Sequence, residues 1–229
     1  MLKEVKSQNT SGIKACLFDL DGVIVDTAKY HYKAWKKMAN ALGFDFSEKE
    51  NEQLKGVSRM DSINLILGWG GLSLSEADKK KWAAQKNEWY LEYLQQMDEK
   101  EILPGALELV QELKTKGYRI ALGSSSKNAV LALSKVAMLA YFEAIIDGTK
   151  TTRSKPDPQV FQMGAAALGC EPAECIVFED AESGVEAALA GGFYAVGMGS
   201  PDNLGKAHLV LSSLKDVSIA EIIAKITVA

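Results

Sequence analysis

Two short apolar runs end directly in acidic residues, and this feature constrains the fold more than any other. Ala15-Cys16-Leu17-Phe18 is followed by Asp19-Leu20-Asp21-Gly22, and Cys175-Ile176-Val177-Phe178 is followed by Glu179-Asp180. Short apolar runs bounded by turn residues are typical of buried strands. In an open α/β sheet the carboxyl ends of the strands share one edge, and ligands bind there. We therefore expect these acidic residues, although far apart in sequence, to converge.

Strands and helices are expected to alternate along most of the chain. Apolar runs and glycine or proline boundaries predict strands at 13–20, 118–122, 144–146, 175–178 and 193–198, and helices at 28–42, 106–116, 128–138, 158–167 and 183–190. Such alternation is typical of a parallel sheet with right-handed crossovers.

One long segment interrupts this alternation after the first strand. Residues 47–100 have helical patterns and contain no proline. We therefore expect an α/β fold: a Rossmann-like parallel sheet core, residues 1–28 and 103–229, with an inserted α-helical cap at residues 29–102. Because the insert follows the first strand, it lies next to the ligand-binding edge and is placed to act as a lid.

An aromatic stripe marks the longest helix expected in the insert. Trp82, Trp89, Tyr90 and Tyr93 fall on one side of a helix that begins after Ser75. Such a stripe can be a ligand platform or the packing face of a small helical domain. We favour packing, because apolar stripes at helical spacing usually face a core.

The net charge and the cysteine content limit the classes of partner and the cellular location that we expect. The net charge is -4 and the pI is near 5.4, which argues against nucleic acid as the main partner. The three cysteines have no spacing typical of a disulfide framework or a zinc site. Residues 1–11 lack the apolar stretch of a secretory signal, and no segment approaches the ~18 apolar residues of a membrane span. We expect a cytoplasmic monomer that binds neither nucleic acid nor membrane.

Two more polar groups are expected at the same edge of the sheet. They are Ser124, in the run Ser124-Ser125-Ser126, and Lys155, in Lys155-Pro156-Asp157-Pro158. Clustered carboxylates repel one another unless a cation joins them, and hard oxygen ligands favour Mg²⁺. Taken singly, each residue has an ordinary structural explanation, such as a turn or a helix cap. Together and in this order, they favour a site for phosphoryl transfer.

The chemistry of such a site follows from its charges. A metal and Lys155 would neutralise a phosphoryl group enough for an aspartate to attack it and form an aspartyl phosphate. The second aspartate can donate and accept protons. Ser124 and the backbone amides of the following loop can hold phosphoryl oxygens.

These groups resemble, in order, the four motifs of the haloacid dehalogenase superfamily of phosphotransferases. Phe18-Asp19-Leu20-Asp21-Gly22-Val23 is similar to the first motif, Ser124 to the second, Lys155 to the third and Glu179-Asp180 to the fourth. The resemblance covers about residues 13–200.

The resemblance implies a role for each acidic residue. Asp19 is the implied nucleophile and Asp21 the implied general acid and base. Asp180 is implied to bind Mg²⁺ together with the Asp19 carboxylate and the Asp21 carbonyl. Glu179 would help to hold the metal through water.

The insert resembles, more narrowly, the cap of the β-phosphoglucomutase family. The resemblance is carried by Asp26-Thr27-Ala28, His31, Trp35, Leu54-Lys55-Gly56-Val57-Ser58-Arg59, Asp61-Ser62 and, in the core, Ser126-Lys127-Asn128. It implies that Arg59 binds the distal phosphate of a sugar bisphosphate and that Lys55 and Gly56 contact the sugar or the loop. His31 is implied to position Asp21 or Lys55. Further substrate contacts are implied for Thr27, Trp35, Ser62, Ser126 and Asn128.

The reaction implied by this resemblance is a step of carbohydrate metabolism. β-D-Glucose 1-phosphate and glucose 6-phosphate would interconvert through phosphorylated Asp19 and β-glucose 1,6-bisphosphate. The cap must exclude water, because an aspartyl phosphate otherwise hydrolyses. A sugar-phosphate phosphatase on the same core is therefore the main alternative. A non-enzymatic protein that binds a phosphorylated ligand is the third, and the preferred sugar stays open.

Overall fold

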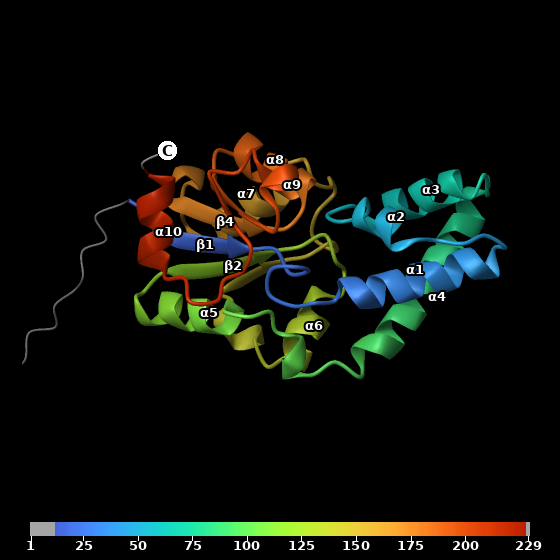
Figure 1. The fold of residues 1–229 in the computed structure, drawn as a ribbon, viewed down its shortest axis with the longest axis horizontal. Helices are drawn as coiled ribbons and strands as arrows, with labels where there is room; N and C mark the ends of the chain where they lie inside the picture. The colour runs from blue at the N-terminus through green and yellow to red at the C-terminus, as the bar shows by residue number, and fades with distance from the viewer. Residues whose placement is uncertain (1–11, 228–229) are drawn as a thin grey trace, which may run out of the picture.

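The residues that the computed structural model describes, 12–227, form one sheet of six strands (Figure 1). Every neighbouring pair of strands is parallel. In the order in which they lie in the sheet, the strands are β3 (Ala144–Ile146), β2 (Arg119–Gly123), β1 (Ala15–Phe18), β4 (Cys175–Glu179), β5 (Tyr194–Met198) and β6 (Leu209–Leu211). The predicted class, an α/β fold with a Rossmann-like parallel sheet, is confirmed.

The strand order changes direction between β1 and β4, and this point positions the acidic residues. Phe18 is in register with Phe178, and the backbone N–H of Asp19 donates to the carbonyl of Phe178 at 2.9 Å. Asp19 therefore lies beside Glu179 at the carboxyl edge of the sheet. A crevice at such a switch point is the usual ligand site of an open α/β sheet.

Helices cover both faces of the sheet because strand residues alternate between the faces. Phe18 and Phe178 pack in one apolar cluster, and Leu17 and Val177 pack in the other. The first cluster includes residues of α5 (Ala106–Thr115), α6 (Ala129–Lys135) and α10 (Ile219–Ile226), and the second includes residues of α7 (Gln159–Leu168), α8 (Glu182–Ala190) and α9 (Pro201–Leu204).

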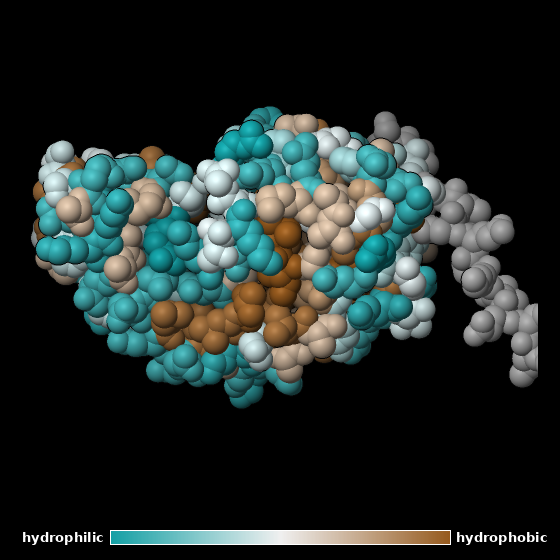
Figure 2. Space-filling model, turned by 180° about the vertical axis from the view of Figure 1, so that it is seen from behind, coloured by the Kyte–Doolittle hydropathy of each residue, from teal (hydrophilic) through white to brown (hydrophobic). Residues whose placement is uncertain are grey.

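The inserted segment is helical and forms a second lobe beyond the carboxyl ends of the strands (Figure 1). It consists of α1 (Ala28–Ala41), α2 (Glu48–Glu52), α3 (Arg59–Trp69) and α4 (Glu76–Leu94), followed by a short 3-10 helix, η1 (Glu99–Glu101). This lobe has its own apolar cluster, which includes Trp35, Met38, Ile63 and Ile66. Figure 2 shows the two lobes from behind with a notch between them, and apolar residues gather in one band near the middle of that face.

Two chain segments connect the lobes, and they lie side by side. Val25 forms an antiparallel bridge with Ile102. The backbone N–H of Asp26 donates to the carbonyl of Glu101, and that of Leu103 donates to the carbonyl of Ile24, both at 2.9 Å. Paired linkers suit a hinge. The division into a core and a cap at residues 29–102 remains a prediction, and these contacts favour it.

The observed elements depart from the predicted bounds in a few places. Helix α7 begins at Gln159, so Pro158 is its N-cap and not its first residue, although the Asp157 carboxylate still accepts from the Gln159 N–H at 2.9 Å. The patterns described above do not include β6, α10 or the 3-10 helices η2 (Leu139–Tyr141) and η3 (Pro172–Glu174). The prediction for residues 1–11 lies outside the described residues. Within the described part of the chain, no helix combines the length and apolarity needed to cross a bilayer.

Candidate active site

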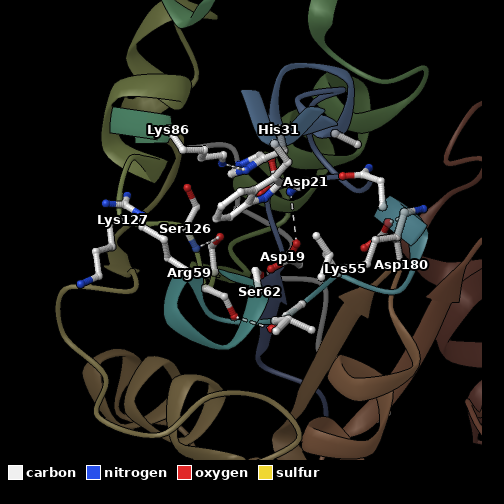
Figure 3. A pocket seen from close by; sticks show the side chains of 18 residues that line it. Asp19, Asp21, His31, Lys55, Arg59, Ser62, Lys86, Ser126, Lys127 and Asp180 are labelled. Atoms are coloured by element: carbon white, nitrogen blue, oxygen red, sulfur yellow. Dashed lines mark hydrogen bonds and ion pairs between the residues drawn. The ribbon is translucent and has the colours of Figure 1, made fainter. Parts of the chain in front are cut away.

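A pocket lies between the carboxyl ends of the strands and the helical lobe (Figure 3). Most of the predicted site residues line it: Asp19, Asp21, His31, Trp35, Lys55, Gly56, Arg59, Ser62, Ser124, Ser126 and Asp180. Side chains from both lobes therefore face one space. Lys155 and Glu179 are buried beneath this lining, against Asp19.

Lys155 joins two carboxylates at the floor of the site. Its ammonium lies 2.6 Å from the Asp19 carboxylate and 2.7 Å from the Glu179 carboxylate, and all three side chains are buried. Burial lowers the pKa of Lys155, but the charges of Asp19 and Glu179 outweigh it and raise this pKa above its ordinary value. Lys155 is thus a permanent cation that fixes the orientation of Asp19.

Three carboxylates at this edge fit a divalent cation. One oxygen each from Asp19, Glu179 and Asp180 lies within 4.8 Å of the others. Burial raises the pKa of Glu179 to about 8 and that of Asp180 to about 6, although Lys155 and Lys55 respectively oppose these shifts. A bound cation would relieve the cost of ionising them together. Hard oxygen donors of this kind match Mg²⁺.

Gly22 makes the close approach of Asp180 possible. Its φ is +76°, and a Cβ at this position would lie 2.2 Å from Oδ2 of Asp180. The glycine expected at the sharp turn after β1 is therefore needed for two reasons, a left-handed backbone and the space for a carboxylate.

Asp21 has the environment of a proton donor and acceptor. Its backbone N–H donates to Oδ2 of Asp19 at 3.1 Å, and its own Oδ1 is buried with no hydrogen-bond partner among the described residues. Burial raises the pKa of Asp21 well above its ordinary value, and the charges of Asp19 and Asp180 raise it further. Asp21 can therefore hold a proton in the pocket, as a general acid must.

In the loop after β2, two serine side chains accept hydrogen bonds from backbone N–H groups two residues later. The Ser124 hydroxyl accepts from the Ser126 N–H at 3.1 Å, and the Ser126 hydroxyl accepts from the Asn128 N–H at 3.3 Å. The Ser125 hydroxyl points the other way and donates to the carbonyl of Gly56 in the helical lobe at 2.9 Å. The run of three serines therefore shapes the pocket and also contacts the helical lobe.

Two cationic side chains of the helical lobe line the pocket. Lys55 precedes α3, and Arg59 is its first residue. Lys55 lies 3.3 Å from the Asp180 carboxylate. Arg59 is the first residue of α3, which Ser58 caps, and its Nη2 donates to Oδ1 of Asn87 at 2.7 Å. No ion pair involves Arg59 among the described residues, so its charge is free to bind an anion.

His31 has a partner that differs from the expected ones. Its Nδ1 lies 2.9 Å from the ammonium of Lys86, and its ring is tilted against the Tyr90 ring with 4.0 Å between the centroids. Among the described residues, His31 forms no hydrogen bond with Asp21 or Lys55. Burial lowers the pKa of His31 well below its ordinary value, and the charges of Lys86 and Arg59 lower it further. The lowered pKa favours a neutral His31, whose Nδ1 can accept from the Lys86 ammonium.

Lys86 is a pocket residue that the sequence patterns did not single out, and Asn51 is another. Lys86 is only 2% exposed, and its ammonium lies over the Trp35 ring at 4.2 Å and the Tyr90 ring at 5.0 Å. A signal was present, because Lys86 falls four residues from both Trp82 and Tyr90 on the aromatic side of the helix. The packing interpretation of that stripe is confirmed, since its residues join the apolar clusters.

Two of the expected substrate contacts lie outside the lining of the pocket. Thr27 is fully buried at the start of α1, and its hydroxyl has no hydrogen-bond partner among the described residues. Asn128 reaches the site through Asn87, whose Oδ1 accepts from its Nδ2 at 2.9 Å. Thr27 is the N-cap of α1, near the linkers between the lobes, and its contact with substrate stays a prediction.

The chain is similar to known proteins over nearly its whole length. Residues 13–192 match the family described as haloacid dehalogenase-like hydrolase. The β-phosphoglucomutase of Bacillus subtilis is 39% identical over 209 residues, covering 90% of this chain and 92% of that protein. A phosphorylated carbohydrates phosphatase of Thermotoga maritima is 28% identical over 215 residues, covering 92% and 97%. The crystal structure of β-phosphoglucomutase from Clostridium difficile superposes with a TM-score of 0.91 at 40% identity, covering 94% and 97%.

Proposed function

The chain belongs to the haloacid dehalogenase-like hydrolase family and is a β-phosphoglucomutase-like enzyme, and we propose that it interconverts β-D-glucose 1-phosphate and glucose 6-phosphate. One observation carries the proposal. The pocket has the Asp19 carboxylate on its core side and the unpaired Arg59 guanidinium on its cap side. A sugar bisphosphate has two phosphates, so one can lie at Asp19 while the other lies at Arg59. The names of the relatives support the choice of sugar phosphate.

Asp19 is the proposed nucleophile. Lys155 holds its carboxylate at 2.6 Å, and the N–H of Asp21 donates to its second oxygen. These contacts fix the direction of attack, and they leave Asp19 at the edge of the sheet where the pocket opens. Attack on a phosphoryl group gives an aspartyl phosphate, which then passes its phosphoryl group to a sugar hydroxyl.

The proposed Mg²⁺ site consists of the carboxylates of Asp19, Glu179 and Asp180 and the backbone carbonyl of Asp21. When bound, Mg²⁺ supplies positive charge that lets an anionic carboxylate approach an anionic phosphoryl group. Ser124 and the amides of its loop are placed to bind the phosphoryl oxygens.

Asp21 is the proposed general acid and base. Its raised pKa suits a carboxyl that protonates the leaving group in one direction and accepts the proton of the attacking sugar hydroxyl in the other. Its position two residues after Asp19 puts both carboxyls in the pocket.

The helical lobe is the proposed cap, residues 29–102, and its task is to keep water from phosphorylated Asp19. It contacts the core from both sides of the pocket, through Gly56 with Ser125 and through Lys55 with Asp180. Arg59 is the proposed ligand of the distal phosphate, and its planar fork suits phosphate oxygens. Contact between that phosphate and Arg59 would hold the cap closed.

A sugar-phosphate phosphatase is the second candidate, because the T. maritima relative carries that activity in its name. One experiment separates the two. Purified protein is incubated with Mg²⁺, β-glucose 1-phosphate and a trace of β-glucose 1,6-bisphosphate, and glucose 6-phosphate and free phosphate are measured in parallel. We expect isomer with little phosphate. Phosphate without isomer establishes the phosphatase, and tight binding with neither product leaves a binding protein.

A further inference from the structure

Asn87 of α4 joins phosphate-facing groups of the two lobes through one oxygen. Its Oδ1 accepts from Nη2 of Arg59 at 2.7 Å and from Nδ2 of Asn128 at 2.9 Å. Arg59 begins α3 in the helical lobe, and Asn128 is the N-cap of α6 in the core. Two donors, one from each lobe, thus converge on a single acceptor.

This acceptor is the only hydrogen-bond partner that residues 12–227 give the Arg59 side chain. An arginine side chain has several rotatable bonds and is poorly fixed without a partner. One fixed N–H sets the plane of the guanidinium, and its other N–H groups stay available for a ligand. The same Asn87 oxygen also orients the side-chain amide of Asn128, which belongs to the core.

Two other contacts between the lobes near the pocket differ in kind. Ser125 donates to the backbone carbonyl of Gly56, and Lys55 pairs with Asp180. Neither of these contacts orients Arg59. The geometry at Asn87 therefore combines two functions, because it aligns the cap arginine and fastens it to the core.

We propose that Asn87 is a positioning residue for the distal phosphate of the substrate, acting through Arg59 and Asn128. Its oxygen holds the two side chains so that their free N–H groups face one phosphate, and it ties the cap to the core while that phosphate is bound. This inference rests on the proposed function, in that Arg59 is the ligand of the distal phosphate.

The test replaces Asn87 with leucine, which has a similar shape and no acceptor oxygen. Loss of the oxygen removes two hydrogen bonds, one of them to a charged group, so we expect the KM for the sugar phosphate to rise by roughly tenfold or more. The kcat should change by only a few-fold, because Asn87 does not touch the reacting atoms.

The matched control is Gln85→Leu, which removes an amide from an exposed position of the same helix. Its KM should equal that of the wild type. An Asn87→Leu enzyme with an unchanged KM overturns the proposal. A fall in kcat alone also overturns it.

Hydrogen exchange gives a readout that needs no turnover. In Asn87→Leu, the amides of residues 124–128 should exchange faster than in the wild type, while those of β1 should not change. Equal exchange in this loop overturns the tie between the lobes. If the wild-type protein releases phosphate and makes no isomer, the mutase proposal fails, whereas the KM of that hydrolysis and the exchange data still test Asn87.

Discussion

The two sides of the pocket are built in different ways. On the core side, Asp19 and Glu179 follow or end neighbouring strands, and Lys155 binds both at 2.6 and 2.7 Å in a fully buried cluster. On the cap side, Arg59 and Lys86 project from helices, and residues 12–227 give each of them one neutral side chain as a hydrogen-bond partner. The core side is thus fixed by sheet register, and the cap side by helix packing and by contacts that can be exchanged.

This difference assigns chemistry to one side and recognition to the other. Bond making at phosphorus needs groups held within a fraction of an ångström, which a strand end provides. Recognition of a distal phosphate needs cations that can move with the cap. If this comparison is right, changes in the core should abolish every reaction of the protein, and changes in the cap should affect only reactions of sugar phosphates.

The largest effect is expected from the nucleophile. Asp19→Asn keeps the shape and a hydrogen bond to Lys155 but removes the attacking charge, so turnover should fall by about four orders of magnitude or more. Thermal unfolding of the variant, followed by circular dichroism, checks that the fold survives. A folded Asp19→Asn protein with substantial activity would end the aspartyl-phosphate mechanism.

The next effect concerns the metal. EDTA should abolish activity and Mg²⁺ restore it, because clustered carboxylates at a phosphoryl site need a counter-charge. Asp180→Ala should weaken Mg²⁺ binding by at least about 100-fold, and Glu179→Ala should weaken it less. Titration of activity with Mg²⁺ measures both. Full activity in a chelated sample would contradict the metal site.

For the free energy of unfolding, we expect the opposite order: Glu179→Ala should lose more stability than Asp180→Ala. Glu179 is fully buried and accepts a hydrogen bond from Lys155, and removing a hydrogen-bond partner of a buried group costs about 1–3 kcal/mol. Asp180 lies beside the half-exposed Lys55, so Asp180→Ala should cost less. Urea unfolding measures both free energies, and equal losses would mean that Lys155 does not depend on Glu179.

A smaller effect is expected on the cap side. Arg59→Ala should slow isomerisation of β-glucose 1-phosphate by about 10- to 100-fold, since a charge-assisted hydrogen bond is worth roughly 1.5–3 kcal/mol. Phosphorylation of Asp19 by acetyl phosphate, followed by mass spectrometry, should continue at nearly the wild-type rate. A variant that isomerises normally would show that Arg59 does not bind the distal phosphate. Equal loss of both reactions would show that chemistry and recognition are not divided between the core side and the cap side.

The smallest effect is on stability, at Lys86. Burial, with the charge of Arg59 adding to it, lowers the pKa of Lys86 well below its ordinary value. Between the folded pKa and about 10.5 the unfolded chain binds more protons than the folded one, so this lysine costs stability that returns as the pH rises. Lys86→Met should therefore unfold at equal or higher urea concentration at pH 7.

The advantage of Lys86→Met should shrink as the pH rises toward 9.5, by at most about 1.4 kcal/mol per pH unit. Urea unfolding at several pH values measures it. A constant difference between variant and wild type across this range would mean that Lys86 is charged in the folded protein.

The sequence by itself determined the core half of the site. Each strand of the parallel sheet places the residue after its last apolar position at one common edge, so Asp19, Ser124 and Glu179 could be brought together from their local patterns alone. The glycine after β1 was also readable, because a sharp turn there requires a left-handed backbone. Local rules were sufficient because the sheet fixes direction and spacing together.

Only the tertiary structure decided the cap half. The partner of His31, the burial of Lys86 and the double acceptance by Asn87 depend on how α1, α3 and α4 pack against one another and against the loop after β2. A helix presents several faces, and its sequence does not specify the neighbour that each face meets. The lysine within the aromatic stripe could be seen, but its role appeared only when α1 brought His31 and Trp35 against it.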